Sequence, residues 1–303
     1  MRPSTNRVPM HHRRDAVFIA DSRRIDLTSS INGRRYAIWI GLPREATPGP
    51  KRALYVLDGH LYFASAVEAA RAEPSAEDAV IVGLASADAQ NATRARLYDL
   101  TLPVSDSVLA TESLPGQFAP TSKDVGGLDA FLETLEKDIK QLVRAHVGAE
   151  LTDQAVFGHS LGGLAVLHAL FVKPEAFVSY IASSPSIWWS EQAVLKGEPF
   201  LANAVTAGAA RPRILITVGA KENEACPAIA RRLNVSLPRL EGAIRRARMI
   251  DNAVELTARL RALTGASPYR VEECAIFPEQ GHSLSAWPAL GRAIAFAFAH
   301  HEV

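Results

Sequence analysis

The chain has 303 residues, 48% of them hydrophobic and 21% charged, and its formal net charge at pH 7 is +1. This composition indicates an ordinary globular protein with an ample core, and a single α/β domain often has this length. The balanced charge provides no overall field that would favour nucleic acid. No apolar run in the sequence reaches the length of a transmembrane helix.

The N-terminal residues 1–15 are rich in arginine and histidine, and no apolar region follows them. A secretory signal needs such a region, so we expect a disordered basic arm over 1–15, a single domain over 16–303 and a cytoplasmic location. Cys226 and Cys274 stand far apart and lack the spacing of metal ligands. We therefore expect buried thiols in a reducing compartment and no bound metal, while a disulfide between the two stays open.

Strand and helix patterns alternate along most of the chain. Apolar and β-branched runs predict strands at 16–21, 35–42, 52–57, 79–84, 155–157, 177–182, 213–219 and 269–277. Helical periodicity predicts helices at 61–71, 128–147, 164–172, 250–263 and 286–301. This alternation is typical of an α/β fold with a mainly parallel, doubly wound sheet flanked by helices.

A polar stretch over 86–127, rich in Ser, Thr, Pro and Gly, interrupts the alternation. A loop this long in a compact domain is usually functional or disordered. It follows a strand, so it belongs to the edge of the sheet at which sites form. We therefore expect a long loop or lid insertion beside the site.

The stretch Phe157-Gly158-His159-Ser160-Leu161-Gly162-Gly163 lies between an apolar strand and an apolar helical run. The G-x-S-x-G pattern in this setting predicts the nucleophile elbow of an α/β-hydrolase fold, with Ser160 as nucleophile. Glycines are expected two residues before and two after the serine, because a side chain there would collide with the neighbouring strand or helix. The backbone N–H of Leu161, at the start of the helix, is expected to face a developing oxyanion.

A serine hydroxyl needs a base to take its proton, and histidine suits that role near neutral pH. In α/β-hydrolases the triad runs in the order serine, acid, histidine. His282 follows the last predicted strand, on the Gly281-His282-Ser283 turn. We therefore expect His282 to be the base that activates Ser160.

The acid is expected just past the strand at 213–219. Glu222 lies directly beyond that strand, and Glu224 is its near neighbour. The carboxylate would hold the imidazole in one tautomer and stabilise the imidazolium. Glu222 is our candidate, and Glu224 or a Ser–His pair without an acid are the alternatives.

Several further motifs are much rarer than G-x-S-x-G. They are Tyr55-Val56-Leu57-Asp58-Gly59, Arg96-Leu97-Tyr98-Asp99-Leu100-Thr101, Gly126-Gly127-Leu128-Asp129-Ala130-Phe131, Ser183-Ser184-Pro185-Ser186-Ile187-Trp188-Trp189 and Gly281-His282-Ser283. With them the chain resembles, from Arg34 onward, the esterase-D-type branch of α/β-hydrolases, and most of all its siderophore esterases of the enterobactin-trilactone type. The resemblance implies ester hydrolysis by Ser160 and His282 without a metal ion or organic cofactor.

The resemblance also implies a role for Arg96. In such esterases the arginine of this motif can face the active serine, so Arg96 is expected in the oxyanion hole or the substrate site. The alternative is that Arg96 pairs with Asp99 or Asp106 and only ties down the loop. The chain departs from the family pattern at Leu102, because the family commonly has proline directly after the motif's threonine.

Trp188 and Trp189 follow the strand after the elbow, so we expect at least one of them to line the pocket. We also expect His60, which comes shortly after the strand at 52–57, to contact the substrate. The expected substrate is a small-molecule ester with a polar or anionic, aromatic acyl part, such as a siderophore trilactone. An acyltransferase using the same serine and a catalytically silent binding protein are the alternatives. Neither nucleic acid nor a membrane is expected as a partner, and the oligomeric state stays open.

Overall fold

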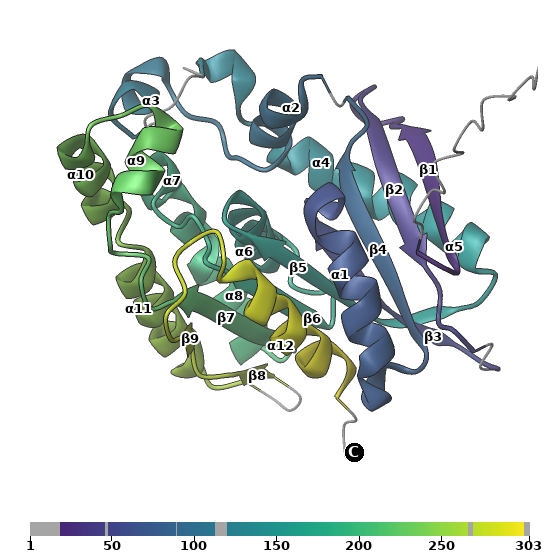
Figure 1. The fold of residues 1–303 in the computed structure, drawn as a ribbon. Coiled ribbons are helices and arrows are strands. Elements are labelled where there is room, and N and C mark those ends of the chain that lie inside the picture. The colour runs from purple at the N-terminus through teal and green to yellow at the C-terminus, as the bar shows by residue number, and fades with distance from the viewer. Residues whose placement is uncertain (1–18, 46–47, 89, 113–119, 266–268, 300–303) are drawn as a thin grey trace, which may run out of the picture.

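The computed structural model describes residues 19–45, 48–88, 90–112, 120–265 and 269–299, and the strands of this part form a nine-stranded sheet (Figure 1). The strands are β1 (Ser22–Thr28), β2 (Arg35–Gly41), β3 (Lys51–Leu57), β4 (Ala79–Ser86), β5 (Leu151–His159), β6 (Ser179–Ser183), β7 (Arg213–Gly219), β8 (Arg270–Val271) and β9 (Ala275–Phe277). Their order is β1-β2-β4-β3-β5-β6-β7-β8, and β9 also pairs with β7. β2 runs antiparallel to β1 and β4, and the other pairs are parallel. The predicted mainly parallel sheet is confirmed.

Helices cover both faces of this sheet. They are α1 (Gly59–Ala72), α2 (Ala92–Asp99), α3 (Asp106–Glu112), α4 (Leu128–Thr134), α5 (Lys140–Val147), α6 (Leu161–Val172), α7 (Trp189–Gln192), α8 (Glu198–Thr206), α9 (Pro227–Leu233), α10 (Leu237–Ala247), α11 (Met249–Arg261) and α12 (Ala286–Phe298). α1 and α12 pack on one face, and α4, α5, α6, α8 and α11 pack on the other (Figure 1). In the described part of the chain, no helix combines the length and apolar character that crossing a membrane requires.

The side chains of the central strands divide between the two faces. On β3, Ala53, Tyr55 and Leu57 join the core beneath α4 and α6, whereas Leu54 and Val56 join the core beneath α1 and α12. Burial on both faces explains why these strands are continuous apolar runs in the sequence. Because parallel strands end at a common edge, the turns after β3, β5, β6 and β7 come together there.

The first strand does not lie where the sequence predicted it. The expected strand at 16–21 falls partly outside the described residues, and 19–21 are not in a strand. The strand is β1, Ser22–Thr28, which pairs with β2 as an antiparallel hairpin. β1 lies at the edge of the sheet and is largely exposed, so it is charged rather than apolar and carries no apolar run. The predicted arm over 1–15 lies outside the described residues.

The described residues of the polar stretch over 86–127 include helices. They form α2, α3 and a short 3₁₀ turn at Ser122–Asp124. On α2 only Ala95 and Asp99 are buried, so the helix has no apolar stripe that periodicity could detect. The expectation of a plain loop was therefore wrong for the residues that form these helices.

Two other predicted elements differ in detail. The helix expected at 128–147 is present, but a π-helical segment at Leu135–Ile139 joins α4 to α5. The single strand expected at 269–277 is divided into β8 and β9, which pair with opposite ends of β7. The residues between them, Glu272-Glu273-Cys274, are not in a strand, although the N–H of Glu272 still donates to the carbonyl of Ile214 on β7 at 3.0 Å.

Arg52 offers a test of how the sheet is joined to its outer elements. Its guanidinium donates to Asp78 at 3.0 Å, to the carbonyl of Phe298 at 2.8 Å and to the carbonyl of Ser75 at 2.6 Å. It thus joins β3 to the segment before β4 and to the end of α12. We expect Arg52→Ala to lower the free energy of unfolding by about 2–4 kcal/mol, because largely buried acceptors lose a charged partner.

Chemical denaturation monitored by circular dichroism measures this loss. Arg24→Ala is the matched control, because Arg24 pairs with Asp26 on the exposed surface, where such a pair contributes less than about 1 kcal/mol. Equal losses in the two variants would contradict the expectation.

Candidate active site

The turn between β5 and α6 has the geometry of a nucleophile elbow. Ser160 occupies it with φ 62° and ψ −116°, backbone angles that a side-chain-bearing residue rarely adopts. The N–H of Ser160 donates to the carbonyl of Ser183 at 2.9 Å, and the N–H of Ser186 donates to the carbonyl of Ser160 at 3.1 Å. These bonds hold the strained turn against the segment that follows β6.

The glycines of the elbow are required at two positions, and one of them was not expected. A Cβ on Gly158 would lie 2.2 Å from the carbonyl oxygen of Gly162, and one on Gly163 would lie 2.8 Å from the carbonyl oxygen of Ser183. A Cβ on Gly162 itself would meet nothing closer than 3.5 Å, an ordinary contact. The expectation of a collision two residues after the serine was therefore wrong, and the close approach occurs one residue later.

Ser160, His282 and Glu222 form a continuous chain of hydrogen bonds. The distance from Ser160 Oγ to His282 Nε2 is 2.9 Å, and that from His282 Nδ1 to Glu222 Oε2 is 2.7 Å. Because an ionised carboxylate can only accept, Nδ1 carries the proton and Nε2 accepts from the serine hydroxyl. The His282 side chain is 41% exposed, whereas the Glu222 side chain is fully buried. The base is therefore open to a ligand and the acid is not.

The buried Glu222 carboxyl remains ionised because it is fully hydrogen-bonded. Its Oε1 accepts from Ser184 Oγ at 2.5 Å, from the N–H of Gly219 at 2.7 Å and from Ser285 Oγ at 3.1 Å. Burial by itself would raise the pKa of this carboxyl. The hydrogen bond and charge of His282 and the hydrogen bonds from Ser184 and Gly219 lower the pKa more than burial raises it, so the pKa lies below its ordinary value.

Glu224, the alternative acid, lies elsewhere. It is exposed to solvent, although only one residue separates it from Glu222 in sequence. Glu222 turns inward because its N–H donates to the carbonyl of Gly219 in a tight turn at the end of β7. The structure thus brings Glu222, and not Glu224, to His282.

His159, the residue before the serine, supports the base from one side. Its ring lies 4.9 Å from the ring of His282, centroid to centroid. Burial, with the charge of His282, lowers the pKa of His159 to about 3. His159 is therefore neutral near physiological pH and adds no charge beside the base.

The end of β6 and the segment after it place three serines around these residues. Ser183 Oγ lies 3.0 Å from Nδ1 of His159, Ser186 Oγ lies 3.5 Å from Oγ of Ser160, and Ser184 makes the bond to the acid described above. Sequence reasoning gave these serines no role. A polar run directly after a buried parallel strand, at the edge that carries the elbow, was the signal that could have found them.

Arg96 pairs with an aspartate that the sequence did not single out. Its Nε and Nη2 donate to the two oxygens of Asp58 at 2.7 and 2.8 Å, and Nη2 also lies 3.4 Å from the carbonyl oxygen of His159. The expected alternative partners were Asp99 and Asp106, and the structure contradicts both. Asp58 directly follows β3 on the same edge as the elbow, so Arg96 is held beside His159, the residue that precedes Ser160.

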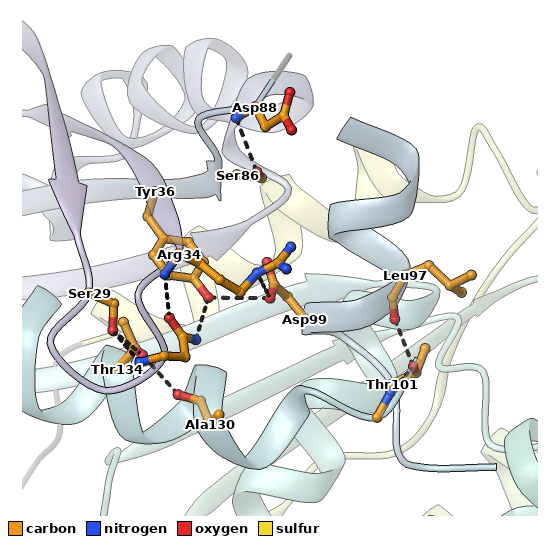
Figure 2. Close-up of polar contacts among 12 residues, drawn as sticks. Ser29, Arg34, Tyr36, Ser86, Asp88, Leu97, Asp99, Thr101, Ala130 and Thr134 are labelled. Atoms are coloured by element: carbon orange, nitrogen blue, oxygen red, sulfur yellow. Dashed lines mark hydrogen bonds and ion pairs between the residues drawn. The ribbon is translucent and has the colours of Figure 1, made fainter. Parts of the chain in front are cut away.

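The remainder of the Arg96 motif anchors α2 (Figure 2). The buried Asp99 lies 2.9 Å from Nε of Arg34 and accepts from the hydroxyl of Tyr36 at 3.3 Å. Thr101 Oγ1 donates to the carbonyl of Leu97 at 2.7 Å and closes the end of the helix. Burial raises the pKa of Asp99 to about 6, although Arg34 and Tyr36 oppose that rise. These contacts fix the position of α2, and with it that of Arg96.

A cavity of about 260 Å³ lies beside Arg96. Its lining includes Asp58, His60, Trp39, Asp99 and Arg96 itself. His60 is exposed at the start of α1 and faces this space, as its predicted contact with a ligand requires. Trp39 was read only as part of a strand in the sequence, and no local signal showed that it reaches the site edge.

The two tryptophans after β6 differ from what was expected. Trp189 is only 4% exposed, and its Nε1 donates to the carbonyl of Leu102 at 3.0 Å. Trp189 therefore belongs to the core, and its predicted place in the pocket wall was wrong. Trp188 is half-buried and packs against Trp189, and the described lining of the cavity contains neither ring. The carbonyl of Leu102, the residue at which the family pattern breaks, thus has a structural partner.

Comparison with known proteins agrees with this geometry. The model of the Esterase family, described as "Putative esterase", matches residues 29–241. The chain is 32% identical over 292 residues to the ferri-bacillibactin esterase BesA of Bacillus subtilis, and the alignment covers 93% of this chain and 91% of that protein. It is 31% identical over 263 residues to a siderophore enterobactin esterase of Emericella nidulans, with 83% of this chain and 84% of that protein covered.

Among solved structures, the siderophore hydrolase EstA from Aspergillus nidulans superposes with a TM-score of 0.75 at 27% identity and covers 92% of this chain and 94% of its own. The family match spans more than half of the chain, and the fold, the elbow and the order of Ser160, Glu222 and His282 along the chain all agree with it. The chain therefore belongs to the Esterase family and has the α/β-hydrolase fold.

Proposed function

We propose that this protein is a serine esterase that hydrolyses a siderophore ester through an acyl-enzyme on Ser160. The observation that carries the mechanism is the chain of hydrogen bonds from Ser160 Oγ to His282 Nε2 at 2.9 Å and from His282 Nδ1 to Glu222 at 2.7 Å. The substrate class comes from the relatives, whose names describe esterases of bacillibactin, enterobactin and triacetylfusarinine C.

In the first half of the reaction Ser160 Oγ attacks the ester carbonyl. His282 Nε2 takes the hydroxyl proton, and the carbonyl electrons move onto oxygen as a tetrahedral oxyanion. We propose that the N–H of Leu161 donates to this oxygen, because Leu161 begins α6 and the first N–H groups of a helix lack intrahelical acceptors. When the oxyanion collapses, the alcohol leaves with the proton from His282, and the acyl group stays on Ser160.

In the second half water attacks the acyl-enzyme. His282 Nε2 takes a proton from the water, and the tetrahedral intermediate collapses to release the acid and the Ser160 alkoxide, which regains the proton. In both halves Glu222 accepts the hydrogen bond from Nδ1–H of His282 and balances the charge of the imidazolium. The low pKa of Glu222 keeps it ionised throughout.

Arg96 and His60, which line the cavity described above, are proposed to contact the acyl part of the substrate, and Trp188, whose ring is outside the described lining, stays a predicted contact. Asp58 holds Arg96 by Nε and Nη2, and no bond to Nη1 is found among the described residues. That nitrogen can donate to a carboxylate or catecholate oxygen, or to the oxyanion, while the pair with Asp58 persists. Trp39 adds an aromatic wall to the cavity. The cavity therefore offers a guanidinium and an aromatic ring to a polar or anionic, aromatic acyl group, although its described lining does not include Ser160 or His282.

We further propose that residues 16–303 act as one domain, since the described strands join a single sheet. The proposed reaction needs no metal ion or organic cofactor, because the nucleophile, base, acid and oxyanion donor are all protein groups. The cytoplasmic location stays a prediction from the sequence.

Replacing Ser160 or His282 by alanine tests the nucleophile and the base. Each change should lower kcat by roughly 10³- to 10⁶-fold, because the members of such a unit fail together. Turnover of a chromogenic short-chain ester measures it, and Ser107→Ala, an exposed serine on α3, is the control that should keep full activity. Near-normal turnover by Ser160→Ala would rule out the assignment.

Glu222→Gln tests the acid. The amide can favour the wrong tautomer of His282, so kcat should fall by at least about 10²-fold. Glu224→Gln is the matched control, because Glu224 is exposed and should leave kcat unchanged. A loss confined to Glu224→Gln would move the role to that residue, and no loss in either variant would leave a Ser–His pair.

Arg96→Ala tests the substrate class. If Arg96 binds an anionic oxygen, kcat/KM should fall at least about tenfold more for a trilactone siderophore than for a neutral acetate ester. Intact and linearised siderophores, with and without iron, complete the panel. Arg94→Ala on the same helix is the control, since Arg94 pairs with Asp124 on the surface.

An equal loss of kcat/KM on both esters would instead indicate that Arg96 stabilises the oxyanion or supports the fold. A preference of the unmodified enzyme for long-chain acyl esters would contradict the substrate class itself.

A further inference from the structure

Glu222 uses its two carboxylate oxygens differently. Oε2 meets Nδ1 of His282 at 2.7 Å, while Oε1 is surrounded by Ser184 Oγ at 2.5 Å, the N–H of Gly219 at 2.7 Å and Ser285 Oγ at 3.1 Å. The carboxylate is wholly buried, so no water shares in holding it. Its orientation toward His282 is therefore set by the groups bound to Oε1.

Of the two serine hydroxyls near Oε1, one is the principal hydrogen-bond donor. Each hydroxyl has a single proton to donate. Ser285 Oγ has the carbonyl of His282 within 2.9 Å and Ser184 Oγ within 2.9 Å as further acceptors. Ser184 Oγ makes the shortest contact to Glu222, at a distance typical of a hydroxyl bonded to an ionised oxygen. Ser184 is thus the principal side-chain donor to Oε1.

The backbone conformation of Ser184 also indicates that its hydroxyl matters. Its φ is 42°, in the left-handed region that glycine adopts at no steric cost and other residues rarely enter. Its N–H donates to the carbonyl of Thr217 at 2.7 Å, so the β6–β7 pairing holds this conformation. Glycine would satisfy the same backbone with less strain. A serine here contributes what glycine lacks, a hydroxyl directed at the acid.

We propose that Ser184 is a positioning residue for catalysis, which acts by locking the Glu222 carboxylate toward His282 through its hydroxyl. The inference rests on the proposed function, because it requires Glu222 to orient the base. Without the hydroxyl, Oε1 loses a short bond, and the carboxylate is free to rotate away from Nδ1. The imidazole then spends less time in the orientation that activates Ser160.

Two variants at position 184 separate the hydroxyl from the fold. Ser184→Ala and Ser184→Gly both remove the hydroxyl, but only glycine relieves the left-handed backbone. We expect both to lower kcat by roughly 10- to 100-fold, the effect of one hydrogen bond to a charged group, with KM nearly unchanged. Thermal unfolding should show Ser184→Gly to be the more stable of the two. Full kcat in Ser184→Gly would overturn the proposal.

A double-mutant cycle shows whether Ser184 acts through Glu222. In a Glu222→Gln background, Ser184→Gly should change kcat less than about twofold, because the carboxylate it positions is gone. A loss of the same size in both backgrounds would assign Ser184 to the fold and overturn the proposal.

The same cycle separates this inference from the proposed function. If Glu222→Gln is impaired and Ser184→Gly is not, only the positioning role fails. If Glu222→Gln keeps full kcat, the acid role fails and the positioning role fails with it. Ser160→Ala then shows independently whether the esterase mechanism stands.

Discussion

The close approach of β5 and α6 at the elbow is the constraint on which the site depends. A Cβ on Gly158 would lie only 2.2 Å from the carbonyl oxygen of Gly162, so the chain can reverse this sharply only where side chains are missing. The reversal forces Ser160 to a φ of 62° and directs its hydroxyl away from both cores. Gly163 extends the constraint, because it allows α6 to pack against the carbonyl of Ser183. The nucleophile and the segment after β6 are thereby placed together.

The parallel register of the sheet assembles the other groups around that serine. His159 pairs with Ser183, Ser183 pairs with Thr217, and Gly219 pairs with Phe277, so β5 and β6 end at one level, and β7 and β9 end two residues beyond it. The turns beyond them bring Glu222 and His282 within hydrogen-bonding reach of Ser160. The buried acid is tolerated there because backbone and hydroxyl donors saturate it. The sheet edge thus supplies both the candidate catalytic groups and the polar contacts that orient them and keep Glu222 ionised.

A second support holds the arginine of the site. α2 buries only Ala95 and Asp99 fully, so apolar packing alone does not position it. The buried Asp99, with Arg34 and Tyr36 of the β1–β2 hairpin and β2, fastens its last turn (Figure 2). Arg96 on the same helix then reaches Asp58 at the end of β3. The N-terminal strands, which are remote from Ser160 in sequence, therefore help to determine where the guanidinium of Arg96 lies.

The sequence by itself determined what local chemistry specifies. Apolar runs and turn glycines predicted the sheet, the elbow and the order of Ser160, an acid and His282, because each of these signals is contained in a few neighbouring residues. It named Glu222 as the candidate acid but left Glu224 open, and it could not place Trp189 in the core or find Asp58 and Ser184 as partners of Arg96 and Glu222. Those outcomes depend on strand register and on which side chains meet across the edge, and contacts between residues 38 positions apart leave no local pattern. Only the tertiary structure decided them.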